Sequence, residues 1–197
     1  MISKRNFKKG FTLVELLVTI SIFVILTGIV LWNQTKFNST ILLTNLAYDT
    51  ALTIRQAQSY GINIKEFNTD QFVPYGVHFE KNAKSFILFA DTHYDPDIPS
   101  VVNKYVGATD KCQSTDSCVN RYSIKRGNYV SNLNIEGVTG NKNSIDIIFR
   151  RPNPDAIIFA DGALISDPTK ALITLTGVDG SFRTVSVQSN GLIEVLR

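Results

Sequence analysis

The pattern of hydrophobic and polar residues changes character three times along the chain. From Phe11 to Trp32 nearly all residues are apolar, and Glu15 is the only charged one. A helix over residues 11–32 would be roughly 33 Å long, close to the thickness of the hydrocarbon layer of a bilayer. This pattern predicts a transmembrane helix over residues 11–32.

Beyond residue 32, small and apolar residues recur every three or four positions, the period of a helix with one buried face. The recurring positions are Leu43, Leu46, Ala47, Thr50, Ile54 and Ala57. Gly61 is of a residue type that commonly follows the end of a helix. We therefore expect one helix over residues 11–61, with its second half packed on the rest of the protein.

From residue 62 the chain changes to short runs of β-branched and aromatic residues, which are typical of strands. The runs are FVPYGVHF, SFILFA, SIDIIF, AIIFA, ALITLT, RTVSV and LIEVL. Three pairs that favour tight turns lie between the later runs: Asp161-Gly162, Asp179-Gly180 and Asn190-Gly191. The sequence predicts a β-rich head over residues 62–197 that ends in a three-stranded antiparallel meander, and an α+β fold for the whole.

Basic residues are concentrated before the apolar run: Lys4, Arg5, Lys8 and Lys9 lie in the first ten residues, which contain no acid. The chain has 20 basic and 17 acidic residues, so without these four the rest is nearly neutral. Basic residues flanking a membrane helix stay on the cytoplasmic side, so we expect a single-pass protein of the cytoplasmic membrane with its head outside. No small-residue cleavage site follows the run, so we expect the helix to be retained.

The string GFTLVE, Gly10 to Glu15, carries the most specific signal in the chain. With the basic residues before it and the apolar run after it, it resembles the leader site of prepilins, the precursors of type IV pilins and type II secretion pseudopilins. In that family, prepilin peptidase cuts after the glycine at the inner membrane and methylates the new amino terminus. The resemblance implies a leader peptide over residues 1–10, cleavage between Gly10 and Phe11, and N-methylation of Phe11.

Glu15 has a physical reason to be present in such a helix. A carboxylate inside a membrane helix costs roughly 2.5–3.5 kcal/mol on insertion scales. Cleavage would create a positively charged amine at Phe11, and each of these two charges offsets the cost of the other when they pair. We expect Glu15 to pair with the terminal amine of a neighbouring pilin or pseudopilin subunit during assembly.

Other parts of the chain favour a minor subunit. Many major pilins have a proline within the apolar helix, whereas no proline precedes Pro74 here. The segments LAYDTALTIRQAQSYG, IDIIFRRPNPDA and GSFRTVSVQSNGLIEVL are similar to segments of H-type minor pseudopilins and related minor pilins. The resemblance implies a pilin-like α+β subunit that initiates or caps a type II secretion pseudopilus or type IV pilus.

The two cysteines, Cys112 and Cys118, lie in a stretch over residues 91–122 that shows no helix or strand pattern. In an exported protein a disulfide between them is expected, and it would stabilise the fold by roughly 2 kcal/mol in the chain-entropy model. The alternative is two reduced thiols in a loop. We expect an exposed loop that the disulfide holds in place.

Asp91, Asp95 and Asp97 lie close to His93, and oxygen ligands at short spacing are the kind that Ca²⁺ prefers. The glycine and the further ligands of a calcium loop are missing. We therefore expect a solvated acidic turn, and no metal or cofactor.

A DNA-binding minor pilin that acts in DNA uptake is the alternative function. Arg150 and Arg151, together with the basic residues of YSIKRGNY, could contact phosphates. The head has no net positive charge, so scattered surface charge is the preferred interpretation. Motifs such as G-x-S-x-G, the P-loop and H-E-x-x-H are absent, so we expect no enzymatic activity.

Overall fold

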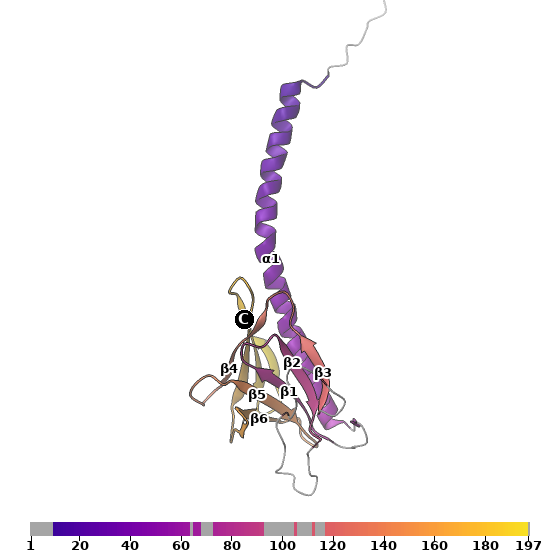
Figure 1. Cartoon of the computed structure of the whole chain (residues 1–197), viewed down its shortest axis with the longest axis vertical. Helices are drawn as coiled ribbons and strands as arrows, with labels where there is room; N and C mark the ends of the chain where they lie inside the picture. The colour runs from indigo at the N-terminus through magenta and orange to yellow at the C-terminus, as the bar shows by residue number, and fades with distance from the viewer. Residues whose placement is uncertain are drawn as a thin grey trace, which may run out of the picture. The chain divides into compact units, whose positions relative to one another are not determined.

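The computed structural model describes residues 10–63, 65–67, 73–92, 105, 112 and 117–196, without the side chains of residues 32–38. Within these residues there are one helix, α1 (Leu13–Ile62), and ten strands (Figure 1). The strands are β1 (Tyr75–Glu80), β2 (Ser85–Ala90), β3 (Cys118–Ser123), β4 (Tyr129–Ile135), β5 (Ser144–Phe149), β6 (Ala156–Ala160), β7 (Ala163–Leu164), β8 (Lys170–Thr176), β9 (Phe182–Gln188) and β10 (Ile193–Leu196). The chain forms two compact units, Met1–Asn38 and Ser39–Arg197.

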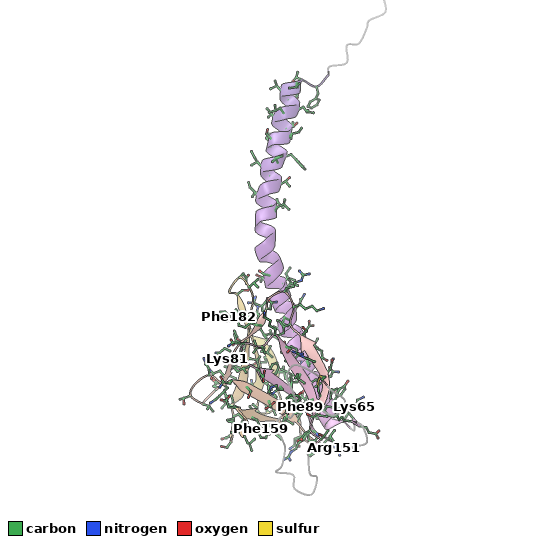
Figure 2. The ribbon with its side chains drawn as sticks, viewed as in Figure 1. Lys65, Lys81, Phe89, Arg151, Phe159 and Phe182 are labelled. Atoms are coloured by element: carbon green, nitrogen blue, oxygen red, sulfur yellow. A yellow bond between two sulfur atoms is a disulfide. The ribbon has the colours of Figure 1, made fainter. Side chains whose placement is uncertain are left out.

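The first unit contains the apolar part of α1. Residues Leu13–Leu31 are long and apolar enough to cross a membrane, with a mean hydropathy of 2.6, and none of this segment is buried. Figure 2 shows its side chains projecting freely from the helix. This apolar surface has no partner among the described residues of the unit, which is the arrangement expected of a helix that lies in lipid or against other helices.

The second unit contains two antiparallel sheets. One has six strands in the order β3-β2-β1-β5-β6-β7, and the other has four in the order β10-β9-β8-β4. The last three strands form the expected meander, with β8 paired to β9 and β9 paired to β10. A helix combined with antiparallel sheets confirms the α+β, pilin-like architecture.

Both sheets share one core with the second half of α1. The helix contributes a buried face of Leu43, Ala47, Ala51, Ile54 and Ala57, which contacts the inner faces of both sheets. These are nearly the positions that the sequence period predicts. Small residues at three of the five positions allow the helix to lie close to the strands.

Side-chain hydrogen bonds connect α1 to one edge strand of each sheet. Tyr122 on β3 donates its hydroxyl to Gln56 (3.0 Å), and Arg55 donates to the carbonyl of Ile193 on β10 (3.4 Å). The helix is therefore flanked by β3 and by β10.

The outer face of the six-stranded sheet carries a second, smaller core. Its buried members are Ile87, Phe89, Tyr105, Cys118, Ile148 and Phe159. Figure 2 shows Phe89 and Phe159 in the same part of the head. A sheet covered on both faces explains why SFILFA and AIIFA read as continuous apolar runs rather than as alternating ones.

Three features differ from the sequence-based expectation. The strands β3, β4 and the two-residue β7 were not predicted; the sequences of β3 and β4, CVNRYS and YVSNLNI, contain too many polar residues to give a strand pattern. Strand β3 begins inside the stretch expected to lack regular structure. The helix also does not stop at Gly61, which lies within α1 one residue before its end.

Candidate processing and assembly site

The expected cleavage site lies immediately before the helix. Gly10 and Phe11 are outside α1, which begins at Leu13, and both are exposed, Phe11 by 73%. Apart from its neighbours in the chain, no atom of the described residues lies within 4 Å of the position that a Cβ at Gly10 would occupy. The bond between Gly10 and Phe11 is therefore in non-helical, open backbone, which is the form of chain that a peptidase can bind.

Glu15 lies in the first turn of α1, three residues after a threonine that caps the helix. The Glu15 N–H donates to Oγ1 of Thr12 (3.3 Å), and the N–H of Leu16 donates to the Thr12 carbonyl (3.1 Å). Thr12 is thus the N-cap, and Glu15 occupies the third helical position, where a carboxylate also interacts favourably with the helix dipole. Glu15 therefore has a local role at the start of the helix in addition to the charge that it places there.

The other polar side chains of this segment are already satisfied within the helix. The hydroxyls of Thr19, Ser21 and Thr27 donate to backbone carbonyls three or four residues earlier, at 2.7–2.9 Å. Such bonds remove the cost of placing a hydroxyl in lipid. Glu15 is the only ionisable group between Leu13 and Leu31, and it is exposed.

The comparisons with known proteins agree with this geometry. Residues 5–31 match the family model of the prokaryotic N-terminal methylation motif. The chain carries the prepilin-type N-terminal motif of the type IV pilin and pseudopilin family. No curated protein and no solved structure is significantly similar to it.

Outside the N-terminal motif, three segments that are distant in the sequence meet at Gln58. Its Nε2 donates to the carbonyl of Pro154 (3.1 Å) and to the carbonyl of Gly191 (2.9 Å). Gln58 belongs to the end of α1, Pro154 to the link between β5 and β6, and Gly191 to the turn between β9 and β10. These three segments are therefore parts of one structural junction, which sequence patterns alone do not reveal.

The two cysteines of the head are bonded to each other in the structure. Cys118 is the first residue of β3 and is buried in the second core, whereas Cys112 is exposed. Tyr105, also from the stretch expected to form an exposed loop, is only 7% exposed and packs on the rings of His78 and Phe89. Part of that stretch is therefore built into the second core.

His78 and Asp146 form a buried pair beside this core. They are opposite each other on β1 and β5, and Nδ1 of His78 lies 2.5 Å from Oδ1 of Asp146. Glu80 lies 3.6 Å from the other ring nitrogen. Burial acts to lower the pKa of His78, but the hydrogen bond and charge of Asp146, with help from Glu80, raise it above the ordinary 6.5. Sequence reasoning did not find this pair, since His78 and Asp146 are far apart in the chain.

This pair predicts a pH-dependent stability of the head. Because folding raises the pKa of His78, its stabilisation is fully present below about pH 6.5 and is lost as the pH rises through the raised value. We expect the melting temperature to fall as the pH rises above about 6.5, and Asp146→Asn to reduce this fall. Thermal unfolding followed by circular dichroism measures both.

The matched control is the only other histidine, His93. His93→Gln should keep the pH dependence of the parent chain. An unchanged pH dependence in Asp146→Asn would show that the pair does not cause it.

The candidate calcium ligands are only partly described. Asp91 is 3% exposed, and its N–H donates to the carbonyl of Pro74 (2.8 Å), so the expectation of a solvated turn is wrong for this residue. Asp95, Asp97 and His93 lie outside the described residues. Among the residues that are described, no group of three or more acids, histidines or cysteines could hold a metal ion.

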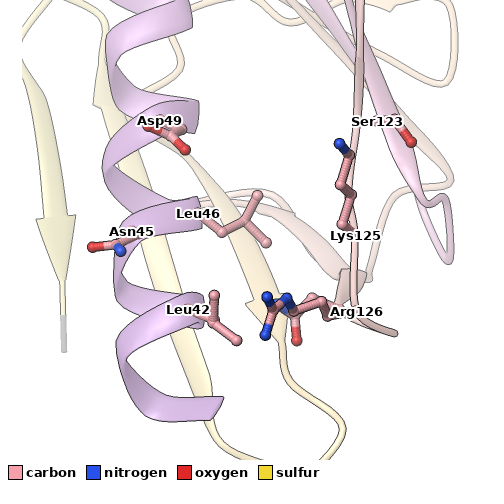
Figure 3. A pocket seen from close by; sticks show the side chains of 8 residues that line it. Leu42, Asn45, Leu46, Asp49, Ser123, Lys125 and Arg126 are labelled. Carbon is pink, nitrogen blue, oxygen red and sulfur yellow. The ribbon is translucent and has the colours of Figure 1, made fainter. Parts of the chain in front are cut away.

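The basic residues considered for DNA binding lie in two places. Arg150 is half-buried, and Arg151 is exposed near the end of the head that carries Lys65 (Figure 2). Lys125 and Arg126 face Leu42 across a pocket of about 430 Å³ (Figure 3). Gly61 contacts Phe149, so the rise of α1 between residues 42 and 61 separates the two places by roughly 28 Å. They do not form one continuous basic strip.

Proposed function

We propose that this chain is a minor structural subunit of a type II secretion pseudopilus or a type IV pilus. Prepilin peptidase cuts it after Gly10 and methylates Phe11, and the retained helix then packs among the helices of other subunits. The observation that carries this proposal is the exposed apolar helix of Leu13–Leu31, with one ionisable side chain, directly after an open Gly10-Phe11 bond. The methylation motif over residues 5–31 supports it.

Charge pairing supplies the mechanism of assembly. The amine at Phe11 and the carboxylate of Glu15 are each costly in an apolar environment, and a helix cannot leave lipid for a bundle without its charges being compensated. A neighbouring subunit that offers the opposite charge compensates both at once. The pairing of the Phe11 amine of one subunit with Glu15 of its neighbour also sets the axial displacement between the helices of the two subunits.

The topology follows from the same segment. The basic residues before Gly10 stay in the cytoplasm, and residues 33–197 lie outside it. The chain is first a single-pass protein of the cytoplasmic membrane and then part of the filament.

We assign the chain to the H-type minor subunits or their pilus relatives. The three similar segments meet at Gln58, so their joint presence has a structural reason. A role in initiating or capping the filament fits this group. A DNA-binding head has weaker support, because the two basic places on it lie far apart and the head lacks net positive charge.

Mass spectrometry of the chain from its native membrane tests processing. We expect a mature species that begins at Phe11 and carries one methyl group on its amine. Gly10→Leu should block cleavage without disturbing the fold, because nothing lies within 4 Å of the added side chain. A mature protein that still begins at Met1, or that begins beyond Trp32, would contradict the proposal.

A further inference from the structure

A groove lies between α1 and the edge strand β10. It has a volume of about 310 Å³ and is lined by Tyr48, Ala51, Leu52, Arg55, Ile193, Glu194 and Val195. Figure 3 shows β10, the yellow strand at the left, on the side of the helix away from Lys125 and Arg126. Its volume falls at the lower end of the range of sites that bind ligands.

The helix wall of this groove is apolar and uncovered. Tyr48 is 57% exposed and Leu52 is 59% exposed. Ile41, which lies about two helical turns before Tyr48, is 42% exposed. Spacings of seven and four place these residues on one face of α1, distinct from the face that packs on the sheets. The second half of the helix therefore has two apolar faces, of which the described part of the head buries one and leaves the other exposed.

The strand wall offers unpaired backbone groups. Glu194 and Leu196 lie opposite Ser186 and Thr184, and the Gln188 N–H donates to the Leu192 carbonyl. Because alternate residues of an antiparallel strand bond to each neighbour, Ile193 and Val195 direct their N–H and C=O groups away from β9. Arg55 contacts the Ile193 carbonyl, while no described strand pairs with this edge at Val195.

Edge strands are usually protected against pairing by lysine, proline or a bulge. The sequence of β10 is Ile-Glu-Val-Leu, and its pairing with β9 has no register shift. Its short length and the charge of Glu194 oppose pairing, but β10 has no lysine, proline or bulge, so a further strand can still add to it. An open strand edge beside an apolar helix face is also the arrangement by which some domains bind extended peptides.

We propose that this groove binds an extended apolar segment of a different filament subunit, which adds as a strand to β10 and places side chains against Tyr48 and Leu52. The identity of the partner as a filament subunit rests on the proposed function. The edge strand β3 of a second copy fits poorly in the groove, since its exposed residues are polar: Asn120, Arg121 and Ser123.

Photo-crosslinking of the full-length chain in its native cells tests the groove. With p-benzoylphenylalanine in place of Tyr48, we expect a crosslink to a strand-forming segment of another protein that carries the methylation motif. Val195→Pro removes the N–H that points away from β9. The loss of this backbone hydrogen bond to the added strand should reduce the yield of crosslinked product about tenfold. Val195→Ala, which keeps the N–H, should leave most of it.

A side-chain substitution on the helix wall tests the same groove without altering the backbone of β10. Leu52→Glu should reduce the crosslink similarly, whereas Leu164→Glu, at a residue 56% exposed on β7, should not. If the chain is cleaved after Gly10 and incorporated into the filament, a crosslink to a second copy, to a helix or to no protein would contradict the proposed groove interaction and leave the proposed function intact. Absence of cleavage would instead overturn the proposed function.

Discussion

Replacing Glu15 by valine is expected to leave the chain in the membrane and to exclude it from the filament. Removal of the charge makes insertion easier by roughly 2.5–3.5 kcal/mol, so the amount of chain in the membrane should not fall. In the filament, the amine at Phe11 of a neighbouring subunit would lose its partner and stay uncompensated in an apolar bundle. The measurement is the fraction of the chain that co-purifies with isolated filaments, relative to the fraction that stays in the membrane.

The decisive companion variant is Glu15→Gln. The structure gives Glu15 two roles, since it occupies the third position of a helix capped by Thr12 and is also the only ionisable group of the span. Glutamine retains the capping geometry but loses the charge. We expect the glutamine variant to be excluded as fully as the valine variant. Normal incorporation of Glu15→Gln would show that capping, not pairing, explains the residue.

The elements that the sequence predicted are those whose burial follows a simple period. The buried face of α1 was predicted nearly position by position, because one side of this helix packs on a single core. The closing meander was predicted from Asp179-Gly180 and Asn190-Gly191, where turn chemistry and strand pattern agree. The strands β3 and β4 were missed because both are edge strands, on which fewer side chains need to be apolar.

The candidate site divides in the same way. Gly10, Phe11 and Glu15 lie close together in the sequence. Their expected roles follow from their own chemistry and from the apolar run after them, and both are visible in the sequence. The Gln58 junction, the pair of His78 and Asp146, and the groove beside β10 join residues that are distant in the chain. Their positions depend on strand order, which the sequence pattern does not determine.

Replacing Gly61 by alanine is expected to destabilise the head strongly. The added Cβ would overlap the carbonyl oxygen of Phe149 and lie 2.8 Å from its carbonyl carbon. These are backbone atoms of β5, a strand paired on both sides, so they cannot move without shifting the six-stranded sheet. Forcing atoms into such a contact costs about 1–3 kcal/mol or more. Thermal unfolding of the detergent-solubilised chain should show a melting temperature lower by several degrees.

The same substitution at Gly28 is the matched control. Gly28 is also in α1, but nothing lies within 4 Å of the Cβ that alanine would add there. Gly28→Ala should therefore leave the melting temperature of the head unchanged, and a gain in helix propensity would only strengthen the helix. If Gly61→Ala unfolds at the same temperature as Gly28→Ala, the close approach of α1 to β5 is wrong. In that case Gly61 would be a helix-ending residue, the role that the sequence first indicated.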